Sequence, residues 1–215
     1  MNPERGIRLF GQHTHYLGLE VAPADSETGS RIGGRPPEAC NPRLGCPRCG
    51  GALSYYWTLE LADQLENAAQ LSILLCRDFT CLLESSASTR VPEPSSIRIV
   101  AHPASPRARA ATETDSNIEP RGLRLTQEQS EPPAPTWPHE GSKVGGRPAL
   151  IQKEGIALAL DKAGLQFVCQ WNELDFPRGM RIGNYPLAGG TLYLFGALAA
   201  ARIDPTRLVA FWQRS

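Results

Sequence analysis

The amino-acid sequence predicts an α+β protein that is rich in β-strand and internally duplicated, with two lobes related by pseudo-twofold symmetry. Three observations lead to this prediction. The heptapeptide "SRIGGRP" at 30–36 returns as "SKVGGRP" at 142–148. Each copy is followed by a segment in which apolar and polar residues alternate, as in a strand with one buried face. Two further apolar segments then follow in the same order in both halves.

The alternating segments are "LSYYWTLEL" at 53–61 and "LQFVCQWNEL" at 165–174, and both keep the same spacing from their heptapeptides. The next pair, "SILLC" at 72–76 and "LYLFG" at 192–196, consists of short apolar runs typical of buried strands. The last pair is "RIVAH" at 98–102 and "RLVAF" at 207–211. Differences in spacing between later pairs indicate insertions in surface loops. We expect a further strand at "YLGLEV", 16–21.

The glycine pairs Gly33–Gly34 and Gly145–Gly146 are expected to be structural turns. Glycine allows positive φ and lets another backbone approach closely, and the proline that ends each heptapeptide fixes the direction of the exit. A phosphate cradle is the functional alternative. It requires additional glycines and a following helix, which neither copy supplies.

The duplication divides the chain into an N-terminal lobe at 1–103, a linker at 104–140 and a second lobe at 141–215. The linker is assigned because 105–140 is rich in Pro, Glu, Ser and Thr and poor in apolar residues, a composition typical of partly disordered connections. Within it, "GLRLT" at 122–126 is a candidate edge strand.

Four cysteines of the first lobe suggest a structural zinc site. "CPRCGG" at 46–51 has the C-x2-C spacing of a zinc knuckle, and "CRDFTC" at 76–81 supplies a second pair. The four candidate ligands, Cys46, Cys49, Cys76 and Cys81, are all missing from the corresponding positions of the second lobe, as a shared ligand set predicts. The alternative is that Cys76 and Cys81 are merely small buried residues. Cys40 and Cys169 have no evident partners and are expected to be packing residues.

The net charge and the hydropathy of the chain argue against two classes of partner, nucleic acids and membranes. The formal net charge is zero, which argues against direct nucleic-acid binding because that needs an excess of Lys and Arg. No apolar run approaches the ~20 residues that cross a bilayer. The N-terminus lacks the pattern of a secretory signal, so we expect a cytoplasmic protein without membrane contact.

The sequence shows no set of residues typical of an active site. No serine has a G-x-S-x-G context, and nothing groups a nucleophile with a base and an orienting residue. Glu60 and Asp63 are candidate paired carboxylates, with a solvated strand end as the alternative. Aromatic residues are common in the predicted strands, and large aromatic side chains anchor many interfaces. The predicted partner-binding residues are Tyr56, Trp57, Glu60, Asp63 and Trp171.

The chain resembles the superfamily that joins bacterial YwqG-like proteins to the eukaryotic programmed-cell-death-2 proteins. The resemblance is carried by "YLGL", the two S-[RK]-[IV]-G-G-R-P elements, "CPRCGGALSYYW" and the closing strand "IRIVAH", and it covers nearly all of the chain outside 104–140. It implies an internally duplicated domain that binds other proteins and does not catalyse a reaction. The second lobe departs from the pattern because it has no knuckle.

The resemblance implies two functions. Some bacterial relatives are immunity proteins, so this chain is expected to bind a cognate effector toxin, such as a nuclease, in a one-to-one complex and to neutralise it. The eukaryotic relatives are chaperones of a ribosomal protein. The alternative is therefore a chaperone-like binder of a basic client, for which Glu60, Asp63 and Glu66 offer acidic groups. An enzyme acting on a small molecule is a third hypothesis.

Overall fold

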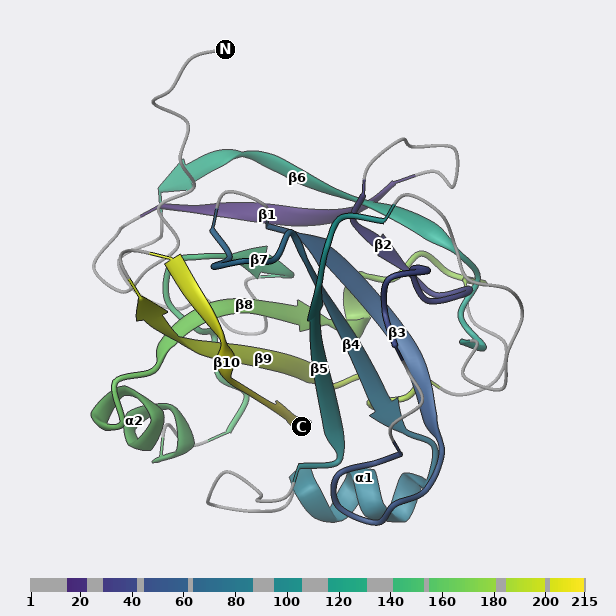
Figure 1. Ribbon diagram of the computed structural model, residues 1–215. Coiled ribbons are helices and arrows are strands. Elements are labelled where there is room, and N and C mark those ends of the chain that lie inside the picture. The colour runs from purple at the N-terminus through teal and green to yellow at the C-terminus, as the bar shows by residue number, and fades with distance from the viewer. Residues whose placement is uncertain are drawn as a thin grey trace.

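The computed structural model of this 215-residue chain describes residues 15–22, 29–41, 45–61, 64–86, 95–105, 116–130, 141–152, 155–180, 185–199 and 202–214 (Figure 1). The strands are β1 (His15–Ala22), β2 (Arg31–Ile32), β3 (Leu53–Glu60), β4 (Gln70–Cys76), β5 (Ile97–His102), β6 (Arg121–Ser130), β7 (Lys143–Val144), β8 (Gln166–Asn172), β9 (Thr191–Ala199) and β10 (Arg202–Gln213). The helices are α1 (Phe79–Ser86), α2 (Gly155–Lys162) and the short 3-10 helix η1 (Glu173–Asp175).

The strands form one antiparallel sheet in the order β10-β9-β8-β7-β1-β6-β2-β3-β4-β5. The prediction of a β-rich protein is therefore confirmed. β3, β4, β8 and β9 coincide with the four segments predicted from alternation and apolar runs. None of the described helices is both long and apolar enough to span a membrane.

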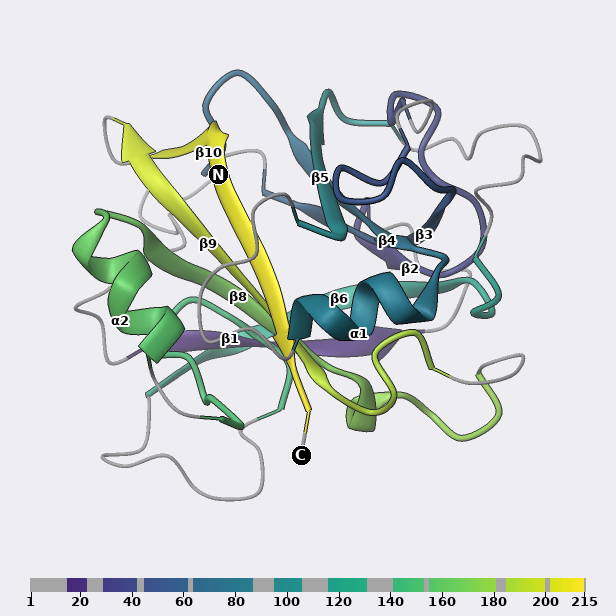
Figure 2. The same ribbon diagram turned by 90° about the horizontal axis from the view of Figure 1, so that it is seen from below.

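The sheet curls until it is nearly closed. Its two edge strands, β5 and β10, lie beside each other. The start of β10 is hydrogen-bonded to the segment that leads into β4. The backbone of Ile203 donates to the carbonyl of Gln64 at 2.6 Å and accepts from the N–H of Glu66 at 3.0 Å. At the other end of β10, the indole N–H of Trp212 donates to the carbonyl of Leu82 in α1 at 3.0 Å. Figure 2 shows α1 beside β10, where it covers the open end of the curl.

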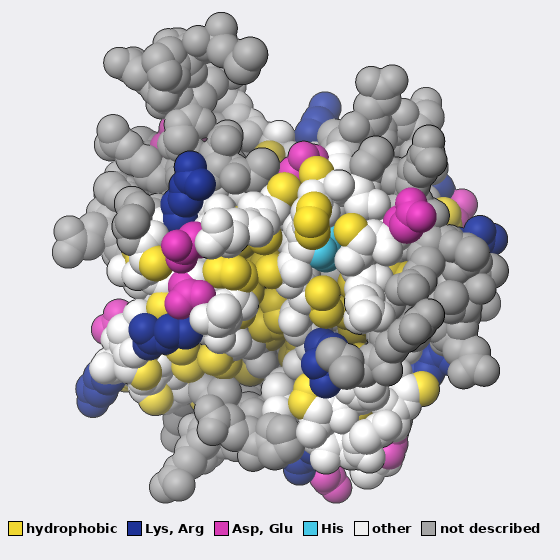
Figure 3. Space-filling view, in the orientation of Figure 1, with side chains coloured by type: hydrophobic (Ala, Val, Ile, Leu, Met, Phe, Trp, Pro, Cys, Tyr) yellow, Lys and Arg dark blue, Asp and Glu magenta, His cyan; other side chains and the backbone are white. Residues whose placement is uncertain are grey.

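Curling places both faces of β3, β4, β8 and β9 in contact with protein, and nearly all of their residues are buried. One large apolar cluster contains Ile32, Trp57 and Ile73 from the first half together with Val144 and Trp171 from the second. Where β5 and β10 approach each other, Ile99, Ala101 and Leu208 are only partly buried against this cluster. The surface in Figure 3 shows hydrophobic side chains in a hollow near these edge strands.

Corresponding strands stand at corresponding distances from the central β1–β6 pair, with β7 to β10 on one side and β2 to β5 on the other. Their backbone contacts also correspond. Gly33 donates to the carbonyl of Tyr56 at 2.9 Å, and Gly145 donates to that of Val168 at 2.8 Å. β1 of the first half pairs with β7 of the second half, and β6, from the segment between the halves, pairs with β2 of the first half.

The strand registers correct the alignment predicted from the sequence. β3 and β8 each carry a bulge at the matching place, between Tyr55 and Trp57 and between Phe167 and Cys169. Tyr55 pairs with Leu74, whereas Phe167 pairs with Phe195, so "SILLC" corresponds to a segment one residue later than "LYLFG". An alignment by apolar residues misses this shift because both registers match apolar residues.

The predicted linker at 104–140 is wrong for Arg121–Ser130, which forms β6 in the middle of the sheet. "GLRLT" is a strand as predicted, but it is not at an edge, because β6 lies between β1 and β2. The composition misleads because most β6 side chains after Leu123 are exposed or half-buried. The strand is held by backbone pairing, to which polar residues contribute as well as apolar ones. Residues 106–115 and 131–140 lie outside the described residues.

All four glycines of the two GGRP elements have positive φ, from 66° at Gly34 to 80° at Gly145, so the prediction of structural turns is confirmed. At Gly33, close packing also leaves no room for a side chain. A Cβ there would lie 2.5 Å from the carbonyl oxygen of Ile118, the residue whose carbonyl accepts from the N–H of Gly34.

Replacement of Gly33 by alanine is expected to destabilise the protein by about 2–4 kcal/mol, because left-handed backbone strain adds to a clash with a backbone oxygen. Gly164→Ala is the matched control: its φ is 75°, but nothing lies within 4 Å of the added Cβ. That variant should lose only about 1 kcal/mol. Urea unfolding of both variants measures the difference, and equal losses would show that the close approach at Gly33 is unimportant.

Candidate metal centre

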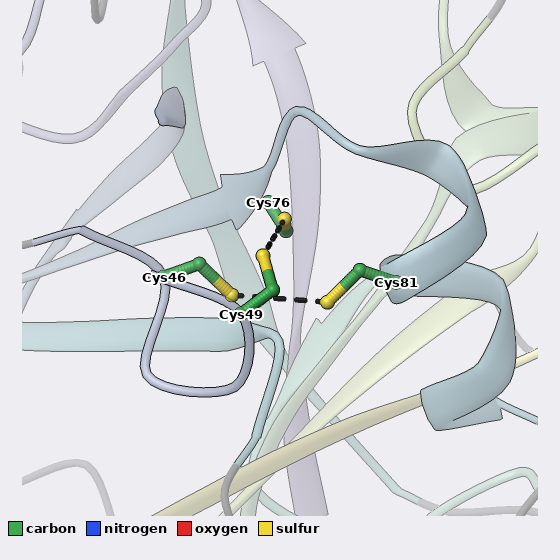
Figure 4. Close-up of side chains that lie close together, drawn as sticks. All are labelled: Cys46, Cys49, Cys76 and Cys81. Carbon is green, nitrogen blue, oxygen red and sulfur yellow. Dashed lines mark hydrogen bonds between the residues drawn. The ribbon is translucent and has the colours of Figure 1, made fainter. Parts of the chain in front are cut away.

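Four cysteine side chains meet at one end of the sheet (Figure 4). The Sγ atoms of Cys46, Cys49, Cys76 and Cys81 all lie within 4.8 Å of one another. Cys46 and Cys81 are 3.9 Å apart and Cys49 and Cys76 are 3.5 Å apart, measured between sulfurs. No disulfide joins them. The sequence prediction that these two pairs form one group is therefore confirmed.

The first pair is held by a tight knuckle. Cys46 donates its N–H to the carbonyl of Gly51 at 2.7 Å and accepts from the N–H of Gly50 at 2.9 Å. Gly50 has a φ of 73°, which explains why glycine follows the second cysteine. The N–H of Gly51 points to the sulfur of Cys49 at 3.4 Å. The chain thus curls so that both sulfurs face inward.

The second pair comes from the end of β4 and the first turn of α1. Asp78 begins the helix: its Oδ1 accepts from the N–H groups of Thr80 at 2.9 Å and Cys81 at 3.3 Å, as an N-cap residue does. The C-x4-C spacing is longer than in a knuckle because it spans this cap. Arg77 donates its backbone N–H to the carbonyl of Ala52, which joins the two pairs.

Burial makes the four thiols unequal. Cys46, Cys76 and Cys81 are buried, whereas Cys49 is exposed. The N–H of Gly51 and the neighbouring thiol of Cys76 lower the pKa of Cys49 below its usual value. Loss of water raises the pKa of Cys81 to about 12 and also raises that of Cys76. A cation would stabilise such a group of clustered thiols in its deprotonated form.

The geometry fits a tetrahedral metal ion. A Zn–S bond of about 2.3 Å places tetrahedral sulfurs about 3.8 Å apart. The two closest sulfur pairs here are 3.5 and 3.9 Å apart and the other pairs lie within 4.8 Å, so the group could hold such an ion. Four protein ligands leave no open position for water or substrate, so such a site is structural. Two further contacts hold the knuckle segment against its neighbours. Arg98 of β5 donates to the carbonyl of Gly45 at 3.0 Å, and Arg48 pairs with Glu84 of α1 at 3.2 Å.

The predicted aromatic anchors are interior residues. Tyr56 is 1% exposed, and Trp57 and Trp171 are fully buried, so the prediction that they contact a partner at the surface is corrected. There are two reasons. The bulge between Tyr55 and Trp57 interrupts the alternation, so the sequence neighbours Tyr56 and Trp57 belong to the same apolar cluster, and the curl of the sheet buries that cluster.

Of the two predicted acidic residues, the structure describes Glu60. Glu60 is half-buried and donates its backbone N–H to the hydroxyl of Ser30 at 2.8 Å. Asp63 lies outside the described residues. Cys40 and Cys169 are buried and are not members of the group of four, although Cys40 packs in the same apolar cluster as Cys46, Cys76 and Cys81.

A serine–histidine pair that the sequence did not indicate lies inside the first half. Ser72 on β4 contacts Nε2 of His102 on β5 at 2.8 Å, and Nδ1 of His102 contacts the carbonyl of Pro103 at 2.8 Å. Because a carbonyl only accepts, Nδ1 carries the proton and Ser72 donates to Nε2. Thr58 and Tyr55 extend the chain at 2.6 and 2.9 Å. Ser72 is completely buried, so this network holds strands together and does not meet a substrate.

A pocket of about 920 Å³ adjoins the cysteine group. β3 and β4, α1, residues 116–117 and residues 185–188 enclose it, and Cys76 belongs to both the pocket and the group of four. Figure 2 shows α1 beside the segment around 185–190. No sequence pattern marked this pocket, because its walls come from four separate parts of the chain.

The chain was compared with known proteins at the level of families and of single sequences. No protein-family model matches it, and no curated protein matches it. The resemblance to the YwqG-like superfamily therefore stays a prediction from the motifs.

Proposed function

We propose that this protein is a non-catalytic binding module, and specifically an immunity protein that binds and neutralises a bacterial effector toxin. The observation that carries the proposal is the pocket beside α1, whose lining includes the apolar side chain of Phe79, which is 48% exposed. Exposed apolar side chains around a hollow are typical of protein–protein contact sites. The complete burial of Ser72 also supports binding over hydrolysis.

The cysteine group is proposed to hold a structural Zn²⁺. Cys46, Cys49, Cys76 and Cys81 would be its ligands, and the ion would fasten the knuckle to β4 and α1. This role suits a small scaffold whose pocket wall contains one of the ligands. The ion would supply folding energy and rigidity, since four thiolates leave no place for a reacting molecule.

The two halves are proposed to descend from one duplicated unit with pseudo-twofold symmetry. The matched order of strands around β1–β6, the matched bulges and the matched glycine turns support this. The group of four cysteines belongs to the first half together with α1, whereas the pocket is lined by residues of both halves. Under this proposal one copy of the unit acquired the metal site while the other kept the scaffold.

Deletion of the gene tests the immunity proposal. The deletion strain should grow like its parent alone and should be killed in co-culture with parent cells, which deliver the toxin. The reintroduced gene should restore survival. Poor growth of the deletion strain in pure culture, with equal survival in co-culture, would contradict immunity and would favour the chaperone of a basic client.

A further inference from the structure

We propose that Cys49 is an oxidation site, at which hydrogen peroxide joins Cys49 to Cys76 in a disulfide and releases the ion from the group of four cysteines. This inference rests on the proposed zinc site and adds a reaction to it. The exposure of the cysteines, the distances between their sulfurs and the number of ligands left after the reaction each contribute to the argument.

Cys49 is the member of the group that a dissolved oxidant can reach. It is exposed and lies in the turn of the knuckle, whereas Cys46, Cys76 and Cys81 are buried. A bound cation holds all four sulfurs as thiolates, and the thiolate is the form of cysteine that attacks a peroxide. Oxidation is therefore expected to begin at Cys49.

Cys76 is placed to complete a disulfide with Cys49. The Sγ atoms of the two residues are 3.5 Å apart. A disulfide of about 2.05 Å requires them to approach each other by about 1.5 Å. Cys76 ends β4, and its backbone N–H donates to the carbonyl of Ser96 at 3.0 Å. We therefore expect the turn that carries Cys49 to move toward Cys76.

The reaction takes two electrons from this pair of sulfurs. The Cys49 thiolate attacks one oxygen of hydrogen peroxide, the O–O bond breaks and hydroxide leaves, which gives a sulfenic acid at Cys49. The Cys76 thiolate then attacks the sulfur of Cys49, the S–O bond breaks and a second hydroxide leaves. In total, two thiolates, one hydrogen peroxide and two protons give one disulfide and two molecules of water.

The disulfide removes two of the four ligands. Cys46 and Cys81 alone cannot enclose the ion, because a structural zinc site uses four ligands. Loss of the ion also removes the link between the knuckle and α1 that passes through Cys81. Since α1 supplies Phe79 and Leu82 to the lining of the pocket, oxidation is expected to loosen one wall of the proposed binding site.

The test treats the full zinc-loaded chain with hydrogen peroxide and measures released Zn²⁺ with a chelating dye. The chain should release its zinc, and a thiol reductant with added Zn²⁺ should restore the loaded form. Cys49→His keeps four possible ligands but removes the reactive thiol, so its release should be at least about tenfold slower. Cys169→Ala is the matched control, because it removes a buried cysteine outside the group, and it should release zinc like the unaltered chain.

Peptide mapping identifies the disulfide. Trypsin cleaves after Arg48 and Arg77, so Cys49 and Cys76 share the peptide 49–77. The other two ligands lie in separate peptides. The expected bond makes peptide 49–77 lighter by two hydrogens without joining it to another peptide, whereas every other pairing within the group links two peptides.

Two results would overturn the inference: zinc that stays bound in peroxide, or a first disulfide that links two tryptic peptides. If Cys49→His does not bind zinc, the peptide map of the unaltered chain decides. A purified chain that cannot be loaded with zinc would contradict the zinc proposal and with it the release, whereas a loaded chain that keeps its zinc in peroxide would contradict this inference alone. The co-culture test of immunity depends on neither result.

Discussion

Replacement of Cys76 by serine is expected to abolish metal binding and to destabilise the protein severely. The unaltered chain should contain one Zn²⁺, and removal of a ligand from a closed four-cysteine site leaves three thiolates that no longer enclose the ion. Zn²⁺ binding to such sites contributes about 10–16 kcal/mol in small peptides at neutral pH. Because a whole domain is stable by only about 5–15 kcal/mol, a fall in melting temperature of about 10 °C or more is expected.

Cys169→Ala is the control for this experiment. Cys169 is as buried as Cys76, but it is outside the group of four, so its loss should cost only about 1 kcal/mol of packing and leave the zinc content unchanged. Elemental analysis and thermal unfolding measure both variants. Equal metal content and equal melting temperatures in Cys76→Ser and Cys169→Ala would show that the four thiols are merely packed together.

Replacement of Glu173 by alanine is expected to destabilise the protein by about 3–5 kcal/mol, because three buried donors lose their acceptor at once. These donors are the hydroxyl of Tyr56 and the N–H groups of Leu187 and Gly189, so the loss also frees the pocket wall from β3. Urea unfolding measures the stability. Hydrogen exchange at 187–190 should rise even under conditions in which the variant is fully folded.

Tyr56→Phe and Glu84→Ala are the comparison variants, and both are expected to lose less stability than Glu173→Ala. Tyr56→Phe leaves two of the three donors paired with Glu173 and should cost about 1 kcal/mol. Glu84 is in an exposed ion pair with Arg48 at the surface, and its removal should cost less than about 1 kcal/mol. A Glu173→Ala variant no less stable than Glu84→Ala would contradict the role given to the buried carboxylate.

The cysteine group could be predicted from the sequence because its evidence is local and comparative. Two cysteine pairs with ligand spacing occur in one half and are replaced together in the other. The glycine turns were predictable for a similar reason, since few structures other than a left-handed turn require two adjacent glycines twice. In both cases a property of the residue itself, the thiol of cysteine or the missing side chain of glycine, limits the structures in which the pattern occurs.

The curl of the sheet could not be predicted, and it decides which aromatic residues are exposed. Alternation in 53–61 indicates a strand but does not say whether its second face meets water or another part of the sheet. Tyr56 is buried because the second half supplies Glu173 and Phe176 against it. Glu173 itself gave no signal, because an acidic residue in "WNELDF" has the composition of a solvated loop. β6 was predicted only as a short edge strand at 122–126, because its backbone pairing on both sides does not depend on apolar side chains.

Native co-purification tests the central claim, which is that the chain acts by binding one protein. The chromosomal copy, tagged and purified gently from cells in competition, should carry a single partner in equal amount, identified by mass spectrometry as a secreted or toxin-like protein. The same purification of the Phe79→Asp variant should recover the chain alone. Recovery of the unaltered chain without a stoichiometric partner from cells that produce the toxin would contradict the account.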